Sequence, residues 1–193
     1  MPRTLLAIFV SALALILSAS AHDGPKGAVV LIIRHAEKPA AGAGLSPRGE
    51  ERAKAYEKYF RTFSVKGLPL HMNAIFAASD SVESQRPRLT VEPLAKALNL
   101  SVDSHFNSKD IPQLAVELRE SQKNKNVLIC WRHREIPDLL RVFGAKPEIL
   151  LPGGIWPDNN FDYVIMLSFN KDGNLIPAKT KRISEQLLPG DSK

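Results

Sequence analysis

Three separated runs of apolar residues, each ending in polar or charged side chains, constrain this chain's fold more than any other feature. They are VVLII at 29–33, NAIFAA at 73–78 and NVLICW at 126–131. Continuous apolar runs of this length predict strands that are covered on both faces, as in parallel sheets. Open sheets of that kind bind ligands at the carboxyl ends of their strands, so we expect the functional site there.

Helix-like segments separate the predicted strands. The first helix is expected over 47–60, because Ser46 suits a helix cap and Pro47 suits the first helical position. Further helices are predicted near 87–98, 111–119 and 136–143, and further strands near 101–103, 161–170 and 174–183. This alternation predicts an α/β fold, a three-layer α/β/α sandwich on a mostly parallel sheet of about six strands.

The first 21 residues have the pattern of a signal peptide. Arg3 precedes the apolar run 5–17, and Ala19-Ser20-Ala21 is a small-x-small cleavage site. A membrane anchor is the alternative, but this run is shorter than the roughly 20 residues that a spanning helix needs. We therefore expect one domain, 22–193, in a periplasmic or secreted protein with no stable membrane span after cleavage.

The composition favours an anion-binding protein over a nucleic-acid-binding one. The formal charge is +6, and it becomes +5 without the leader because Arg3 is the leader's only charged residue. No zinc-finger, helix-turn-helix or aromatic-basic pattern accompanies this charge, so we expect no nucleic-acid partner. Cys130, the single cysteine, lies inside an apolar run and is interpreted as a buried core residue.

Basic residues and histidines cluster just after the predicted strands. Arg34 and His35 follow the first strand, Arg86 comes shortly after the second, and His133 follows the third. Arginine binds phosphate oxygens through two parallel hydrogen bonds, and imidazole is a nucleophile or a donor. The pattern indicates a cationic pocket suited to phosphoryl transfer.

Three motifs in the same order resemble the histidine phosphatase superfamily, also called phosphoglycerate mutase-like. RHAEK at 34–38 resembles its Arg-His-Gly-Glu signature, and SDSVESQRPRLTVEPLAKAL at 79–98 resembles its Ser…Arg-Ala-x-x-Thr segment. VLICWRHREIPDLL at 127–140 resembles the strand-histidine-helix element of that superfamily. The expected mature length leaves no room for the large helical cap domain of the acid phosphatase branch, so we expect a member of the small branch.

The resemblance implies a role for each matching residue. His35 attacks phosphorus and carries a transient phosphohistidine, while Arg34, Arg86 and His133 hold the phosphoryl oxygens. The implied activity is that of a phosphomonoesterase that needs no metal and no other cofactor. His35 has to be neutral to attack, and we expect His133 to be cationic, so that their pKa values are pushed apart.

The sequence departs from the superfamily pattern at some positions. Ala36 replaces the usual glycine, and Arg134 replaces a small residue after the second histidine, where it is a candidate for the substrate rim. The general acid is not part of a matching motif. Asp110 is the first candidate for that role and Asp103 is the second. An enzyme without a positioned acid would lose about 10²–10⁴ in rate.

The sequence also allows other interpretations of several residues and of the function. Glu37 and Glu135 form His-x-Glu pairs, but they lack the companions of a metal site, so Glu37 is interpreted as a rim or orienting residue. His105 is a further rim candidate, and Trp156 is expected to anchor an ordered turn at 151–160. The expected partner is a small phosphorylated substrate such as an envelope phosphosugar. The alternative function is a non-catalytic phosphate receptor with the same pocket.

Overall fold

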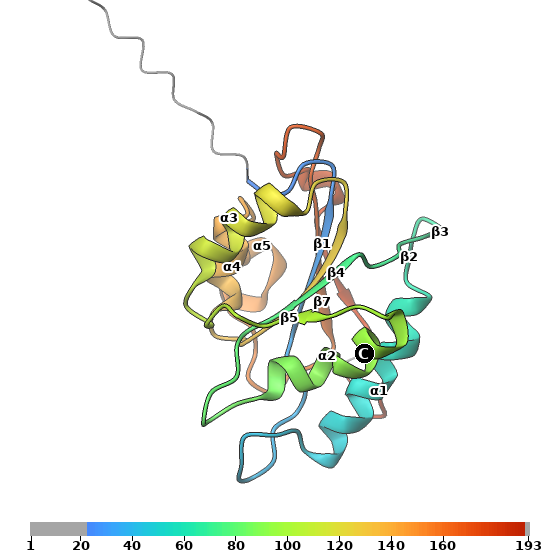
Figure 1. The fold of residues 1–193 in the computed structure, drawn as a ribbon, viewed down its shortest axis with the longest axis vertical. Coiled ribbons are helices and arrows are strands. Elements are labelled where there is room, and N and C mark those ends of the chain that lie inside the picture. Colours follow the sequence, from blue (N-terminus) through green and yellow to red (C-terminus); the bar gives the residue numbers. More distant parts are fainter. Residues whose placement is uncertain (1–22, 192–193) are drawn as a thin grey trace, which may run out of the picture.

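A computed structural model describes residues 23–191; the predicted signal peptide and His22 lie outside the described residues. One sheet has six strands in the order β5-β4-β6-β1-β7-β8, and β2 and β3 form a separate hairpin (Figure 1). The strands are β1 Val29–Arg34, β2 Ser64–Val65, β3 Leu68–Pro69, β4 Ala74–Ala77, β5 Val102–Asp103, β6 Asn126–Trp131, β7 Tyr163–Ser168 and β8 Lys181–Ser184. The helices are α1 Pro47–Arg61, α2 Arg86–Leu98, α3 Ile111–Ser121, α4 Ile136–Val142 and α5 Pro147–Leu150, with 3-10 turns η1 Pro152–Gly154 and η2 Pro177–Lys179.

Helices cover both faces of the sheet, which confirms the predicted three-layer sandwich. Alternate residues of β1 point to opposite layers: Val30 and Ile32 pack with α3 and α4, whereas Leu31 and Ile33 pack with α1 and α2. The same alternation explains why the runs are apolar throughout. Cys130 of β6 is fully buried in the α1–α2 layer, and burial raises the pKa of its thiol, as expected for a core residue.

The local signals for the helix starts are confirmed. The Ser46 hydroxyl accepts the backbone N–H of Gly49 at 3.1 Å, and Pro47 occupies the first position of α1. Pro87 likewise lies in the first turn of α2. The sequence analysis did not predict the β2–β3 hairpin, α5 or the two 3-10 turns, which are all short.

The strand directions decide what meets at the edge of the sheet. Strands β5, β4, β6 and β1 pair in parallel, so their carboxyl ends share one edge. Strand β7 runs antiparallel to β1, and the loop 155–162 that precedes it therefore arrives at that same edge. Register places Arg34 opposite Trp131, and the backbone N–H of His35 donates to the Trp131 carbonyl at 3.0 Å. Both histidine motifs therefore lie together, beside the 155–162 loop.

No helix in the range 23–191 is long and apolar enough to cross a membrane.

Candidate active site

A cavity of about 490 Å³ lies at the carboxyl edge of the sheet. It brings together the four residues that the sequence pattern singled out: Arg34, His35, Arg86 and His133. Its other charged lining residues are Lys38, Glu83, Arg132, Arg134, Glu135 and Asp158. The sequence analysis named Arg134 as a rim residue, and its position in the lining agrees with that expectation.

His35 is held in one tautomer at the inner end of the cavity. Its Nδ1 lies 2.8 Å from the carbonyl oxygen of Ala36, and because a carbonyl only accepts, Nδ1 carries the proton. The lone pair is then on Nε2. Burial lowers the pKa of His35 to about 3, with further lowering from the charges of Arg34 and Arg86. The imidazole is thus neutral across the physiological range, as a nucleophile requires.

Arg34 is buried, and the loop before β7 fixes its guanidinium. The Nη1 donates to three backbone carbonyls at 2.7–3.0 Å, those of Pro157, Asp158 and Asn160. The guanidinium also stacks on Phe161, with 3.9 Å from its carbon to the ring centre. Burial lowers its pKa to about 10, so it stays charged at neutral pH. These contacts hold the remaining N–H groups in a fixed orientation.

His133 lies between Arg34 and Asp158. Its Nδ1 lies 3.3 Å from Arg34 Nη2, which can only donate, so Nδ1 accepts and Nε2 carries the proton. Nε2 donates to Asp158 Oδ1 at 2.7 Å. Burial and the charge of Arg34 lower the pKa of His133. This corrects the expectation that His133 is cationic: in the structure both histidines are neutral, because both are desolvated beside the same arginine.

Arg86 begins α2, and Thr90 couples that helix to the segment after β1. The Thr90 hydroxyl donates to the Arg86 carbonyl at 2.7 Å and accepts the backbone N–H of Ala36 at 2.8 Å. Arg86 Nη1 donates to the carbonyls of Gly42 and Ala43, at 3.4 and 3.3 Å. The two motifs that carry His35 and Arg86 are therefore joined through one buried hydroxyl.

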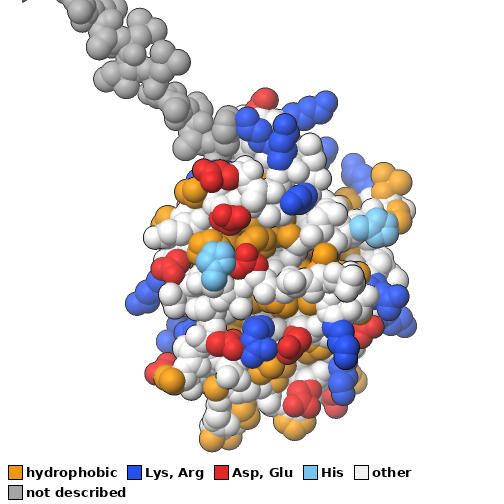
Figure 2. All heavy atoms as spheres, viewed as in Figure 1, with side chains coloured by type: hydrophobic (Ala, Val, Ile, Leu, Met, Phe, Trp, Pro, Cys, Tyr) orange, Lys and Arg blue, Asp and Glu red, His pale blue; other side chains and the backbone are white. Residues whose placement is uncertain are grey.

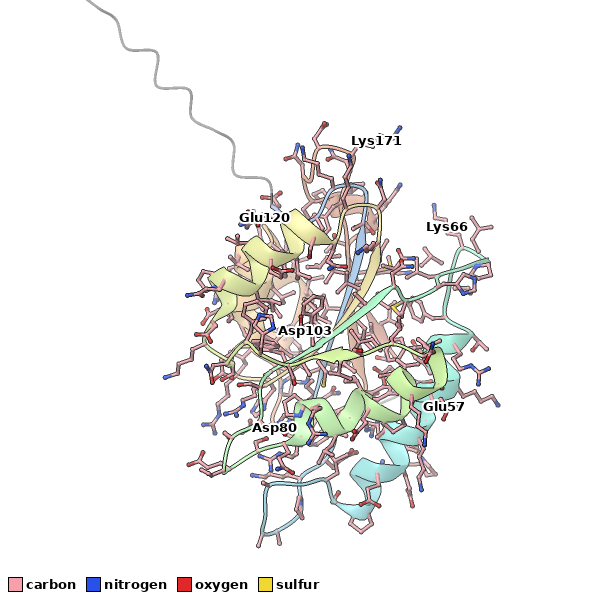
Figure 3. The ribbon with its side chains drawn as sticks, viewed as in Figure 1. Glu57, Lys66, Asp80, Asp103, Glu120 and Lys171 are labelled. Atoms are coloured by element: carbon pink, nitrogen blue, oxygen red, sulfur yellow. The ribbon has the colours of Figure 1, made fainter. Side chains whose placement is uncertain are left out.

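The structure does not bring Asp110, Asp103 or His105 into the cavity lining. The Asp110 carboxylate accepts the backbone and side-chain N–H groups of Asn107 at 2.9 and 3.0 Å, at the start of α3. Asp103, the last residue of β5, pairs with His105 in the loop that follows. Figure 3 labels Asp103. Strand β5 is the outer strand of the sheet, and these three residues lie on it or in the loop that follows it. Their position does not support Asp110 or Asp103 as the general acid, or His105 as a rim residue.

Glu37 faces a second cavity, of about 530 Å³, rather than the one around His35. Its carboxylate pairs with the buried Arg52 at 2.8 Å and with Arg48 at 3.2 Å, and both arginines also pair with Asp191. This corrects the rim assignment of Glu37, because its carboxylate belongs to an ion-pair network behind the site. The arginines of this second cavity have carboxylate partners, whereas Arg34 and Arg86 have none within residues 23–191.

Of the cavity residues that the sequence analysis did not name, Asp158 and Arg132 bear most directly on the chemistry of the site. Asp158 belongs to the segment 151–160, whose sequence contains only turn signals. Trp156 anchors this segment as expected: its side chain is buried, with 3% exposure, and its Nε1 donates to the Asn160 carbonyl at 2.9 Å. Arg132 was detectable, because it follows an apolar strand in the same way as Arg34. Only the antiparallel direction of β7 brings the 151–160 segment to the cavity.

Comparison with known proteins identifies the fold. No family profile and no curated protein matches the sequence. Among solved structures, the chain is similar to the protein histidine phosphatase SixA complexed with tungstate, with a TM-score of 0.53 and 16% identity over 81% of this chain and 97% of that chain. It is also similar to phosphoglycerate mutase from Bacillus anthracis, with a TM-score of 0.53 and 13% identity over 80% and 92%. Alpha-ribazole phosphatase from Shigella flexneri matches with a TM-score of 0.52 and 14% identity over 86% and 100%.

These proteins share the arrangement of strands and helices with this chain at identities too low to carry function by themselves. The motifs at 34–38, 79–98 and 127–140 lie on the sheet edge where the superfamily resemblance placed them. The chain therefore has the histidine phosphatase fold, the phosphoglycerate mutase-like architecture that its motifs resemble.

Proposed function

We propose that this chain is a phosphomonoesterase that works through a phosphohistidine on His35. The observation that supports this most is the tautomer of His35: Nδ1–H is donated to the Ala36 carbonyl, which leaves the lone pair on Nε2. That nitrogen belongs to a neutral, buried imidazole in a cavity lined by Arg34 and Arg86. A neutral nucleophile beside two cations fits attack on an anionic phosphoryl group.

The proposed reaction has two steps. The Nε2 lone pair attacks phosphorus, the ester P–O bond breaks, and the leaving oxygen takes a proton to become an alcohol. Water then attacks the phosphohistidine, gives up a proton to a base, and releases orthophosphate from Nε2. Arg34, Arg86 and the Nε2–H of His133 hold the phosphoryl oxygens through both steps.

Asp158 is our assignment for the group that supplies and recovers the proton. It is the cavity carboxylate in contact with the proposed phosphate-holding residues, through His133 Nε2 at 2.7 Å. His35 is 6% exposed, whereas the Asp158 side chain is 82% exposed, so the nucleophile lies at the inner end of the cavity and the carboxylate lies at its mouth. A leaving group opposite the nucleophile points toward that mouth.

Substrate binding would itself prepare Asp158 as an acid. Its bond to His133 lowers the pKa of Asp158 in the structure. A phosphoryl group that takes over the His133 N–H removes this stabilisation and adds negative charge nearby, and both changes raise the carboxyl pKa. Asp158 would then hold a proton while the ester bond breaks.

The test of the function uses a nitrophenyl phosphate with no added metal. We expect turnover, and rapid acid-free quenching with a ³²P-labelled aryl phosphate should trap a phosphohistidine that maps to His35. His35→Ala should abolish both signals and keep the unfolding transition. A variant that retains a tenth or more of the activity contradicts the nucleophile assignment.

A phosphate receptor without turnover is the second candidate. The observation that favours it is the occupation of His133 Nε2 by Asp158, which a bound phosphate has to displace. Saturable binding of inorganic phosphate with no hydrolysis across a panel of aryl and alkyl esters would support the receptor and contradict the enzyme.

We also propose that the protein is exported and acts on a small phosphorylated substrate of the cell envelope, such as a phosphosugar. The proposal is supported by the leader pattern at 1–21. Intact-mass measurement of protein from the periplasm or the medium should give a chain that begins at His22. Recovery of membrane-bound protein that retains Met1 would contradict it.

A further inference from the structure

Arginines without a carboxylate partner are concentrated around one cavity. Among the described residues, Arg48, Arg52, Arg61, Arg88 and Arg141 form ion pairs with Asp or Glu. The arginines without such a pair in that part of the chain are Arg34, Arg86, Arg119, Arg132, Arg134 and Arg182, and all of these except Arg119 and Arg182 line the cavity around His35. On the face drawn in Figure 2, by contrast, Lys and Arg side chains lie among Asp and Glu side chains.

Several of these guanidinium groups also have a buried N–H with no acceptor. Within residues 23–191, four arginine Nε atoms are buried and have no hydrogen-bond partner: three belong to Arg34, Arg86 and Arg132 at this cavity, and the fourth belongs to Arg119 away from it. A buried donor without an acceptor is unfavourable, more so on a charged group. Three of these four guanidinium groups line one cavity and have no carboxylate partner within the described residues, so an anion bound there would stabilise them.

Arg132 lines the same cavity as Arg86, close enough for the two charges to interact. Its Nη2 donates to the Ser81 hydroxyl at 3.1 Å, in the loop that leads to α2. The charge of Arg132, after burial, is the second cause of the lowered pKa of Arg86. Asp158, the exposed carboxylate of the cavity, contacts His133 instead. Two neighbouring guanidinium groups without a carboxylate repel each other unless an anion bridges them.

We propose that the substrate carries a second anionic group, which bridges Arg86 and Arg132. This inference rests on the proposed function. The phosphoryl group that reacts is held by Arg34, Arg86 and His133 beside His35, so Arg86 contacts both anionic groups. The second group, a phosphate or a carboxylate, lies toward Ser81 and accepts from the Arg132 guanidinium. The substrate class is therefore a phosphate ester with two anionic groups close together, rather than a simple monoester.

The test compares two ligands that the protein cannot hydrolyse, methylphosphonate and methylenediphosphonate, by titration calorimetry. Wild-type protein should bind the diphosphonate about ten-fold or more tightly than the monophosphonate. Arg132→Gln should lose about ten- to one-hundred-fold in diphosphonate affinity and less than about three-fold in monophosphonate affinity. Arg88→Gln is the matched control, because Arg88 lies on the same helix as Arg86 but pairs with Asp80 and Glu92, and it should change neither affinity.

Other outcomes overturn the proposal. Equal losses for both ligands in Arg132→Gln would assign Arg132 to the phosphoryl group that reacts. Unchanged affinities would make it a solvated surface residue. A thermal unfolding curve for each variant separates these results from misfolding. Failure of the proposed function gives a different result: no phosphohistidine forms on His35, while the protein still binds the diphosphonate more tightly than the monophosphonate and still loses that preference in Arg132→Gln.

Discussion

The Thr90 hydroxyl accepts a hydrogen bond from the backbone N–H of Ala36 at 2.8 Å, and both residues are fully buried. The same hydroxyl donates to the Arg86 carbonyl at 2.7 Å. One side chain on α2 thereby sets the distance between the strand end that carries His35 and the helix start that carries Arg86. Together with the bonds from Arg86 Nη1 to the Gly42 and Ala43 carbonyls, this hydroxyl joins the start of α2 to the segment after β1.

Thr90→Val should destabilise the protein, because valine has a similar shape but leaves the Ala36 N–H without an acceptor. The expected loss is about 1–3 kcal/mol of unfolding free energy. Urea unfolding measures it, with Thr90→Ser as the control that keeps the hydroxyl. Equal stability of the valine and serine variants would show that the hydroxyl has no such role.

The protonation of His35 should be visible in its NMR titration. Because burial lowers its pKa from 6.5 to about 3, the ring signals should show no midpoint between pH 5 and pH 7. The ring signals of His35 are those that disappear from the spectrum of the His35→Gln variant. A midpoint near 6.5 would show that the imidazole is solvated, and it would remove the main support for a neutral nucleophile.

The same pKa shift predicts how stability depends on pH. Below 6.5 the unfolded chain binds a proton at His35, whereas the folded chain does so only near 3, so this residue lowers stability as the pH falls from 6.5 toward 3. His35→Gln cannot bind that proton. The variant should therefore gain stability relative to wild type between pH 7.5 and pH 5 in chemical unfolding experiments, and a constant difference would contradict the shift.

Asp158→Asn distinguishes a proton donor from a competing anion. If Asp158 donates the proton, phosphoenzyme formation from an alkyl phosphate should slow by about 10²–10⁴, and formation from a nitrophenyl phosphate should slow much less. Asp110→Asn is the control, and it should affect both substrates equally or not at all. Faster turnover of both substrates in Asp158→Asn would instead show that the carboxylate only blocks His133.

Arg52 should be far more important for stability than its neighbour Arg48. The Arg52 side chain is 1% exposed and pairs with Glu37 and Asp191, so Arg52→Ala leaves these two carboxylates with only the half-exposed Arg48 as a partner. We expect a loss of about 3–5 kcal/mol. Arg48 is 42% exposed, and Arg48→Ala should cost about 0–1 kcal/mol. Thermal unfolding of the two variants compares them directly, and similar losses would contradict a special role for burial.

The fold was predictable because its main signals are local or periodic. The uninterrupted apolar runs at 29–33 and 126–131 require cover on both faces, and the cap at Ser46 with Pro47 marks a helix start without reference to any distant residue. The short β2–β3 hairpin and α5 were missed, since elements of two to four residues carry too few positions for a periodic signal.

By itself, the sequence determined which residues end the parallel strands, and hence that Arg34, His35 and His133 share an edge of the sheet. Only the tertiary structure decided the environment of those groups. Asp158 reaches His133 because β7 runs antiparallel, and Asp110 stays outside because the loop after the outer strand β5 holds it. Burial, which depends on every packed layer, lowers the pKa of both histidines, and at His133 burial and the charge of Arg34 outweigh the nearby Asp158 carboxylate. Strand ends follow from local pattern, whereas proton positions follow from distances between residues far apart in the chain.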